Sequence, residues 1–258
     1  MIKRAAIQAL KLDGVKGFLG HTAARALGRP HFLVPASSID FRNAGLSCTR
    51  TEFLFIRSVL PNVSSETIEE SLDFARSLPE LNISNEADLK FPERWNSGSG
   101  LQHVMAALVY LVKPSLVVET GTANGASALA ITAALHARQS GKLLSLDIVD
   151  CEATLVPKHL REYVTFVRVD GTVENLRNVL EAEESKNKVS IFLHDADHSY
   201  FGQQNDYQVA REFNFDLIIS DDVDTSLAFI DFAGTSGVVL YDVPKFIGGL
   251  LENKALKV

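Results

Sequence analysis

The segment Leu116–Ser127 constrains the fold of this chain more than any other feature. Three apolar residues and Glu119 lead into a turn spaced by Gly121 and Gly125, and an alanine-rich segment follows. A short apolar run bounded by glycine is typical of a buried strand, and the alanine-rich segment is typical of a helix. Strand, tight turn and helix in this order form the nucleotide-binding start of a doubly wound α/β domain. The sequence therefore predicts a ligand at this turn, with the first helical N–H groups directed into the crevice.

Strand and helix patterns alternate along the chain after this turn, which predicts a parallel sheet with helices on both faces. A short helix and two closing strands are expected at the C-terminus. The expected strands are 116–119, 143–148, 164–169, 189–194, 217–220, 237–241 and 246–251, and the expected helices are 100–112, 126–138, 153–163, 173–185, 200–213 and 225–233.

Residues 1–95 have a different pattern, with short helices expected near the start and at 51–60 and 66–78. The polar segment Asn96–Gly100 predicts a boundary between this helical region and a ligand-binding domain at 96–258, and serves either as a linker or as a lid. The N-terminal region either covers the site or builds a homodimer or larger homo-oligomer. Its first 30 residues are basic, which favours a solvated face or a subunit contact over binding to an anionic surface.

The overall composition excludes several classes of protein. The chain has 258 residues, 46% of them hydrophobic, and a formal net charge of −7, which argues against non-specific nucleic-acid binding. Cys48 and Cys151 have no metal or redox spacing, so we expect a reducing, cytoplasmic location. No apolar run reaches the roughly 18 residues of a membrane span, and we expect no stable membrane insertion.

Two ligand classes suit the glycine turn. A dinucleotide motif needs a second glycine where Ala123 stands, and Glu119 would lie near the phosphates, so a nicotinamide cofactor is disfavoured. S-adenosylmethionine has no phosphate and carries an ammonium and a sulfonium, which an acidic strand end suits. Asp147 follows the next strand, where a carboxylate accepts from ribose hydroxyls. Asp170 and Gly171 are placed to bound the adenine, although Asp170 suits a turn or helix cap equally.

Three sequence features carry a resemblance to a known family: the Glu119–Ser127 motif, the acidic residue at 147, and the Asp-Ala-Asp-His-Ser-Tyr run at 195–200. Over about residues 100–222 the chain resembles class I S-adenosylmethionine-dependent methyltransferases. The nearest branch groups small-molecule O-methyltransferases, including macrolide-sugar and aminocoumarin tailoring enzymes, with cephalosporin hydroxylase-like proteins. The resemblance implies a doubly wound, Rossmann-like seven-stranded sheet of order 3-2-1-4-5-7-6 with strand 7 antiparallel. Phe213–Asp216 replaces the family's usual Pro-Gly-Gly turn. The candidate cofactor-binding residues are Glu119, Gly121, Thr122, Asn124, Gly125, Ser127, Asp147, Asp170, Gly171 and Asp195.

Four carboxylates follow two strands that are neighbours in this order, and they are expected to converge because adjacent strands lie about 4.8 Å apart. They belong to Asp195, Asp197, Asp221 and Asp222. Carboxylates held this close repel unless one is protonated or a cation is bound, and oxygen ligands suit Mg²⁺. The resemblance implies that Asp195, Asp221 and Asp222 hold the metal and that Asp197 is the base.

The identity of the base is open at this stage. Asp197 suits proton removal from a metal-bound hydroxyl, but it also suits a cap of the following helix. His198 titrates near neutrality, although such a histidine more often packs beside a cofactor. Tyr200 and Gln203 are candidates for the pocket wall. His194 is expected to pack at the strand end.

These observations favour a cytoplasmic S-adenosylmethionine-dependent O-methyltransferase that acts on a small-molecule hydroxyl, with a divalent metal. The acceptor is expected to be a sugar or a glycosylated metabolite. Metal-independent transfer to nitrogen or oxygen, with Asp197 or His198 as base, is the alternative in the same fold. A nicotinamide-dependent oxidoreductase and a non-catalytic binding module are the alternatives from other classes.

Overall fold

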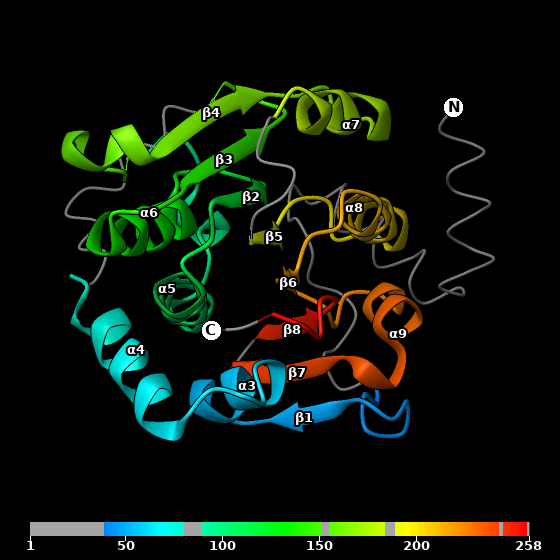
Figure 1. The fold of residues 1–258 in the computed structure, drawn as a ribbon. Helices are drawn as coiled ribbons and strands as arrows, with labels where there is room; N and C mark the ends of the chain where they lie inside the picture. The colour runs from blue at the N-terminus through cyan, green and yellow to red at the C-terminus, as the bar shows by residue number, and fades with distance from the viewer. Residues whose placement is uncertain (1–38, 80–88, 151–154, 184–188, 243–244, 257) are drawn as a thin grey trace, which may run out of the picture.

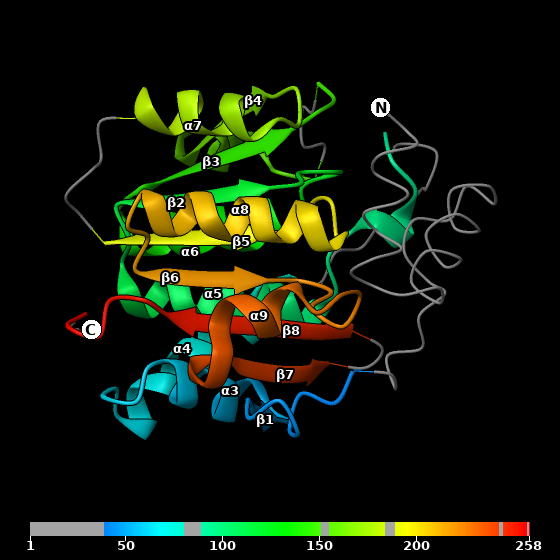
Figure 2. The same ribbon diagram turned by 90° about the vertical axis from the view of Figure 1, so that its right-hand side faces the viewer.

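The computed structural model consists of a twisted sheet between two layers of helices (Figures 1 and 2). It describes residues 39–79, 89–150, 155–183, 189–242, 245–256 and 258. The expected helices near the N-terminus, the basic residues there and Cys151 lie outside these ranges. The strands are β1 (Ser47–Thr49), β2 (Leu116–Thr120), β3 (Lys142–Asp147), β4 (Val164–Arg168), β5 (Ser190–His194), β6 (Leu217–Ser220), β7 (Val238–Asp242) and β8 (Lys245–Leu251).

The eight strands are arranged in the order β1-β7-β8-β6-β5-β2-β3-β4. Strands β2 to β6 run parallel, and β8 is antiparallel to both β6 and β7. The predicted seven-strand order with its antiparallel strand is therefore confirmed. The expected strand count was wrong by one, because the three-residue strand β1 from the N-terminal region pairs in parallel with β7. So short a strand leaves no readable alternation in the sequence.

Helices cover both faces of the sheet, and each layer has its own hydrophobic core. In Figure 1, α3 to α6 lie on one side of the sheet and α7 to α9 on the other. Both faces of the central strands are buried, which explains their continuous apolar runs. The helices are α3 (Glu52–Val59), α4 (Ser65–Ser77), α5 (Ser99–Val112), α6 (Ala126–Arg138), α7 (Val173–Glu181), α8 (Tyr200–Glu212) and α9 (Ala228–Ala233).

Local sequence signals explain where most of these helices begin. The side chains of Thr51, Ser64 and Ser199 accept hydrogen bonds from backbone N–H groups in the first turns of α3, α4 and α8. The helix expected over 153–163 is wrong as far as the structure describes it, since only a 3₁₀ turn at Lys158–Tyr163 forms. Pro157 explains the difference, because its ring and missing N–H interrupt a helix that would enter from 153.

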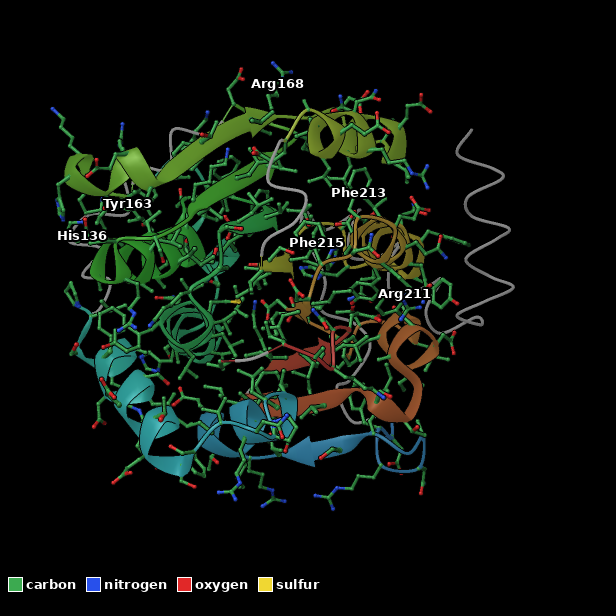
Figure 3. All side chains as sticks on the ribbon, viewed as in Figure 1. His136, Tyr163, Arg168, Arg211, Phe213 and Phe215 are labelled. Carbon is green, nitrogen blue, oxygen red and sulfur yellow. The ribbon has the colours of Figure 1, made fainter. Side chains whose placement is uncertain are left out.

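Three of the side chains labelled in Figure 3, namely His136, Tyr163 and Arg211, make contacts between neighbouring elements. The Arg211 guanidinium of α8 lies 3.9 Å from the ring centre of Phe232 in α9, and its Nε donates to Glu252 at 2.9 Å. On the opposite layer, the rings of His136 and Tyr163 meet edge to face at 5.4 Å. In the ranges that the structure describes, no helix is both long and apolar enough to span a bilayer.

Candidate active site

A cavity of about 530 Å³ lies at the carboxyl ends of β2, β3 and β5. This is the edge where doubly wound sheets bind their ligands, and the volume suits a small-molecule site of roughly 300–1,000 Å³. The predicted site residues that line it are Gly121, Thr122, Ser127, Asp147, Gly171, Asp195, Asp197, His198 and Asp222. Glu119, Asn124, Gly125, Asp170 and Asp221 are not among the lining residues.

The glycine turn is fixed from two directions. Gly121 has a φ of +92°, and a Cβ there would overlap the carbonyl oxygen of Asp195, so only glycine fits. One oxygen of Asp147 accepts hydrogen bonds from the backbone N–H groups of Thr122 and Ala123, at 3.0 and 3.1 Å. Asp147 thus joins the ends of β2 and β3 while it lines the cavity. Its predicted contact with a ribose stays a prediction.

Glu119 lies inside the protein, behind the turn. Its side chain is fully buried and accepts hydrogen bonds from the hydroxyls of Ser127 and Ser145. Burial raises the pKa of Glu119 to about 7, although both hydroxyls lower it. In this position the carboxyl group links β2, β3 and α6. Its predicted contact with a cofactor stays a prediction.

Asn124 connects the turn to the segment that precedes α5. Its amide nitrogen donates to the Phe91 carbonyl at 3.0 Å and to the Asn96 side-chain oxygen at 2.9 Å, while its amide oxygen accepts from the Phe91 N–H at 2.9 Å. Trp95, which is 41% exposed, stacks on Phe91 with ring centres 5.7 Å apart and lines the cavity. The expected lid or linker at Asn96–Gly100 leads directly into α5, with Gly98 at its N-cap.

Asp170 is exposed and stabilises a turn, which was one of its two predicted roles. Its Oδ1 accepts from the N–H and the hydroxyl of Thr172, at 2.8 and 2.6 Å, and these hydrogen bonds lower its pKa. Gly171 lines the cavity instead, beside an apolar wall. The residues of that wall include Leu146, Ile148, Val169, Val173 and Leu176.

Three of the predicted carboxylates do converge, together with a lysine from β8. The Lys245 Nζ lies 2.7 Å from an oxygen of Asp221 and 3.6 Å from an oxygen of Asp222. The His198 Nε2 lies 3.6 Å from Asp195 and 3.7 Å from Asp222. Asp222 has a φ of +49°, which costs an L-residue roughly 1–2 kcal/mol. Such strain is typical of functional positions.

Burial controls the electrostatics of this cluster. It raises the pKa of Asp195 well above its ordinary value, and the charge of Asp221 raises it further. Burial and the neighbouring Asp222 likewise raise the pKa of Asp221, and they raise that of Asp224 to about 7. For Lys245 burial acts in the opposite direction, but the surrounding carboxylates raise its pKa overall. These directions favour the charged form of the lysine and the protonated forms of Asp195, Asp221 and Asp224.

The cluster does not have the arrangement of a metal site. In the described part of the chain, no three His, Cys, Asp or Glu side chains could hold a metal ion together. The Lys245 ammonium lies in hydrogen-bonding contact with Asp221, one of the three predicted ligands. The other oxygen of Asp221 is buried and has no hydrogen-bond partner among the described residues. The predicted ligands thus approach one another around a lysine.

The two candidate bases occupy different environments. Asp197 is exposed, and its carboxylate accepts from the N–H and hydroxyl of Ser199 at 3.1 and 3.0 Å, which holds the start of α8. His198 is 4% exposed and lines the cavity between two carboxylates. Tyr200 and Gln203 do not line the cavity. The Tyr200 hydroxyl donates to Asp231, and Gln203 is buried against Ser226.

Two groups near the cavity were missed by the sequence interpretation. Lys245 is a single lysine without a motif, yet it begins the antiparallel strand, whose start lies at the same edge as the ends of the parallel strands. That signal was available once the strand order was expected. Asp206 accepts from Thr120 and contacts the buried His194, both at 2.7 Å. The position of Asp206 in the second turn of α8 carries no signal by itself.

Comparisons with known proteins agree with this architecture. Residues 118–217 match a family model described as a methyltransferase domain. No curated protein sequence is a significant match to the chain.

Among solved structures, an O-methyltransferase from Bacillus cereus in complex with SAH is 16% identical over 77% of this chain and 96% of that chain, with a TM-score of 0.44. The O-methyltransferase TomG from Streptomyces achromogenes, described as involved in tomaymycin synthesis, is 12% identical over 79% and 97%, with a TM-score of 0.47. The SAH-bound methyltransferase PaMTH1 from Podospora anserina is 13% identical over 73% and 88%, with a TM-score of 0.46. Likenesses this distant carry no argument about substrate or metal.

The family match and the strand order agree on the fold. Residues 118–217 match a methyltransferase domain, and the sheet around them has the strand order of a doubly wound, Rossmann-like domain.

Proposed function

We propose that this enzyme transfers the methyl group of S-adenosylmethionine to a hydroxyl oxygen of a small molecule. The observation that carries the proposal is the position of His198, which is buried, lines the cavity and faces Asp195 and Asp222. A hydroxyl is a weak nucleophile at neutral pH, so its methylation needs a base within hydrogen-bonding reach. The small size of the cavity supports a small acceptor rather than a macromolecule.

The cavity offers different surroundings to the two ends of the cofactor. The glycine turn and Asp147 lie at one end, where backbone N–H groups and a carboxylate are available to the ribose and the amino-acid part. The apolar wall near Gly171 and Ile148 suits the adenine. Asp195 and Asp222 face the cationic sulfonium, which favours a positively charged donor over a pyrophosphate.

In the proposed step the acceptor hydroxyl loses its proton to the Nε2 of His198. A lone pair of that oxygen attacks the methyl carbon, and the electrons of the breaking carbon–sulfur bond stay on sulfur, so that S-adenosylhomocysteine leaves. Alignment of the three reacting atoms supplies much of the acceleration. Asp197 holds the start of α8 and thereby positions His198.

Divalent-metal assistance, which the sequence favoured, stays a prediction. The carboxylates that would ligate the ion do not fit it, because Lys245 contacts Asp221. The metal-independent alternative with His198 as base therefore has the better support. A nitrogen acceptor would use the same base. The cytoplasmic location and the homo-oligomer also stay predictions.

Isothermal titration with S-adenosylmethionine, S-adenosylhomocysteine and NAD(P)H tests the class of ligand. We expect micromolar binding of the first two and none of the nicotinamides. A screen of hydroxylated small molecules with methyl-labelled donor then tests transfer, in parallel with and without EDTA. Binding of NAD(P)H alone, or labelled product only from amine acceptors, would contradict the proposal.

A further inference from the structure

Lys245 was not among the site residues predicted from the sequence. It begins β8, whose register brings it to the edge where β5 and β6 end. Its side chain is 18% exposed, lines the cavity and contacts Asp221 and Asp222. Within the described ranges, no other lysine or arginine forms an ion pair with these two carboxylates. Lys245 thus supplies a positive charge to a cluster of carboxylates whose other basic group is the imidazole of His198.

The place of this ammonium is the place that a divalent ion would need. An ion bound by Asp221 and Asp222 lies about 2.0–2.6 Å from their oxygens. The Lys245 Nζ is 2.7 Å from the Asp221 oxygen, so an ion bound to that same oxygen would lie next to the ammonium. Two positive charges placed side by side repel each other. The two cations therefore exclude each other.

The surroundings keep the ammonium where it is. Asp221 is fully buried, and leaving its charge without a partner would be costly. The hydrogen bond from Lys245 to Asp221 and the contact with Asp222 hold the ammonium in the cluster.

We propose that Lys245 is the resident cation of this active site and takes the place of a divalent metal. The inference rests on the proposed function in one respect, namely that the acceptor oxygen lies beside this cluster. There the ammonium donates a hydrogen bond to the oxygen as its proton passes to His198, and it stays protonated throughout the transfer. The unpartnered oxygen of Asp221 is the feature that argues most for a metal, and the test is therefore made on metal binding.

Mn²⁺ is the probe, because it shares the oxygen-ligand preference of Mg²⁺ and the free ion is counted by electron paramagnetic resonance. The full chain is titrated as wild type, Lys245→Met, Lys245→Arg, Asp221→Asn and Lys245→Met with Asp221→Asn. Methionine removes the charge at similar length, and arginine keeps it. Circular dichroism shows which variants are folded.

We expect wild type and Lys245→Arg to leave Mn²⁺ free at millimolar concentration. Lys245→Met should bind one Mn²⁺ at least about tenfold more tightly, because the repelling charge is gone. Adding Asp221→Asn should abolish that gain. The thermal midpoint of Lys245→Met should rise with Mn²⁺, while that of wild type should not.

A folded Lys245→Met that gains no Mn²⁺ affinity would overturn the proposal. Wild type that binds Mn²⁺ in a manner abolished by Asp221→Asn would overturn it as well. If Lys245→Met does not fold, the comparison of wild type, Lys245→Arg and Asp221→Asn decides alone. Since the readout is metal binding, its failure leaves methyl transfer untouched, and absence of transfer leaves the binding result standing.

Discussion

At the residue scale, Glu119 is a buried carboxyl group that acts as a neutral hydrogen-bonding link. The hydroxyls of Ser127 and Ser145 donate to it, and burial raises its pKa to about 7 from an ordinary value of 4.5. Between these values the folded state holds a proton that the unfolded chain has released. The contribution to stability is therefore full below about pH 4.5 and is lost as the pH rises towards 7.

Glu119→Gln should remove this pH dependence, because the amide stays neutral and keeps hydrogen-bonding groups on both sides. In wild type, the free energy of unfolding that Glu119 contributes should fall by roughly 3 kcal/mol over this pH range, at about 1.36 kcal/mol for each pKa unit. Urea unfolding at pH 5 and pH 8 measures it. The exposed Glu69→Gln on α4 is the matched control and should keep the wild-type difference. An unchanged difference in Glu119→Gln would refute the neutral link.

Substitutions at the two candidate bases, His198 and Asp197, should have different effects on activity. His198→Gln should lower the rate of methyl transfer by at least about 100-fold, since it removes the proton acceptor from the cavity. Asp197→Asn should lower it less than about tenfold, because an amide oxygen still accepts from the Ser199 N–H. Single-turnover transfer to the first acceptor found measures both. Equal losses in the two variants would assign the proton to Asp197 instead.

At the element scale, Glu52 of α3 joins three helices. Its carboxylate contacts Arg76 of α4 at 2.9 Å and His103 of α5 at 2.8 Å. Burial opposes its charge, yet these two partners lower its pKa overall. A lowered pKa gives stability that is present above the unfolded value and is lost as the pH falls through the folded value.

Glu52→Gln should therefore destabilise the protein by about 1 kcal/mol at neutral pH, a modest value because Arg76 is half exposed to solvent. The effect should shrink as the pH falls below the ordinary value of 4.5, once the wild-type carboxyl group takes up a proton. Thermal unfolding across this range checks it, with Glu69→Gln as the control. A loss that is constant with pH would mean that packing, and not charge, joins the helices.

The elements show what the sequence could predict. Apolar runs set the central strands, and caps such as Ser64 and Ser199 set helix starts, because these signals act over a few residues. The strand order came from the family resemblance. The three-residue strand β1 and the 3₁₀ turn at Lys158–Tyr163 depend on tertiary pairing and on Pro157. The roles of Glu119 and Lys245 depend on contacts with residues that are distant in the sequence. A local sequence pattern does not predict such contacts.

At the scale of the whole molecule, one wall of the cavity comes from residues 95–97, which lie before α5 in the chain. Figure 2 shows the short turn Glu93–Trp95 beside the ends of the central strands. Asn124 fastens this segment to the turn through three hydrogen bonds to Phe91 and Asn96. The glycine turn and the segment 91–96 are thus one hydrogen-bonded unit.

Trp95 is the only tryptophan of the chain and lines the cavity, so its fluorescence reports on that site alone. Saturation with S-adenosylhomocysteine should change its emission, at the midpoint that calorimetry gives. Asn124→Ala should weaken binding by about tenfold and reduce the emission change, since each hydrogen bond contributes about 1 kcal/mol. Thr165→Ala, at an exposed position of β4, should alter neither. If calorimetric binding leaves the emission of Trp95 unchanged, the segment does not cover the cofactor, and the unit formed through Asn124 serves the fold alone.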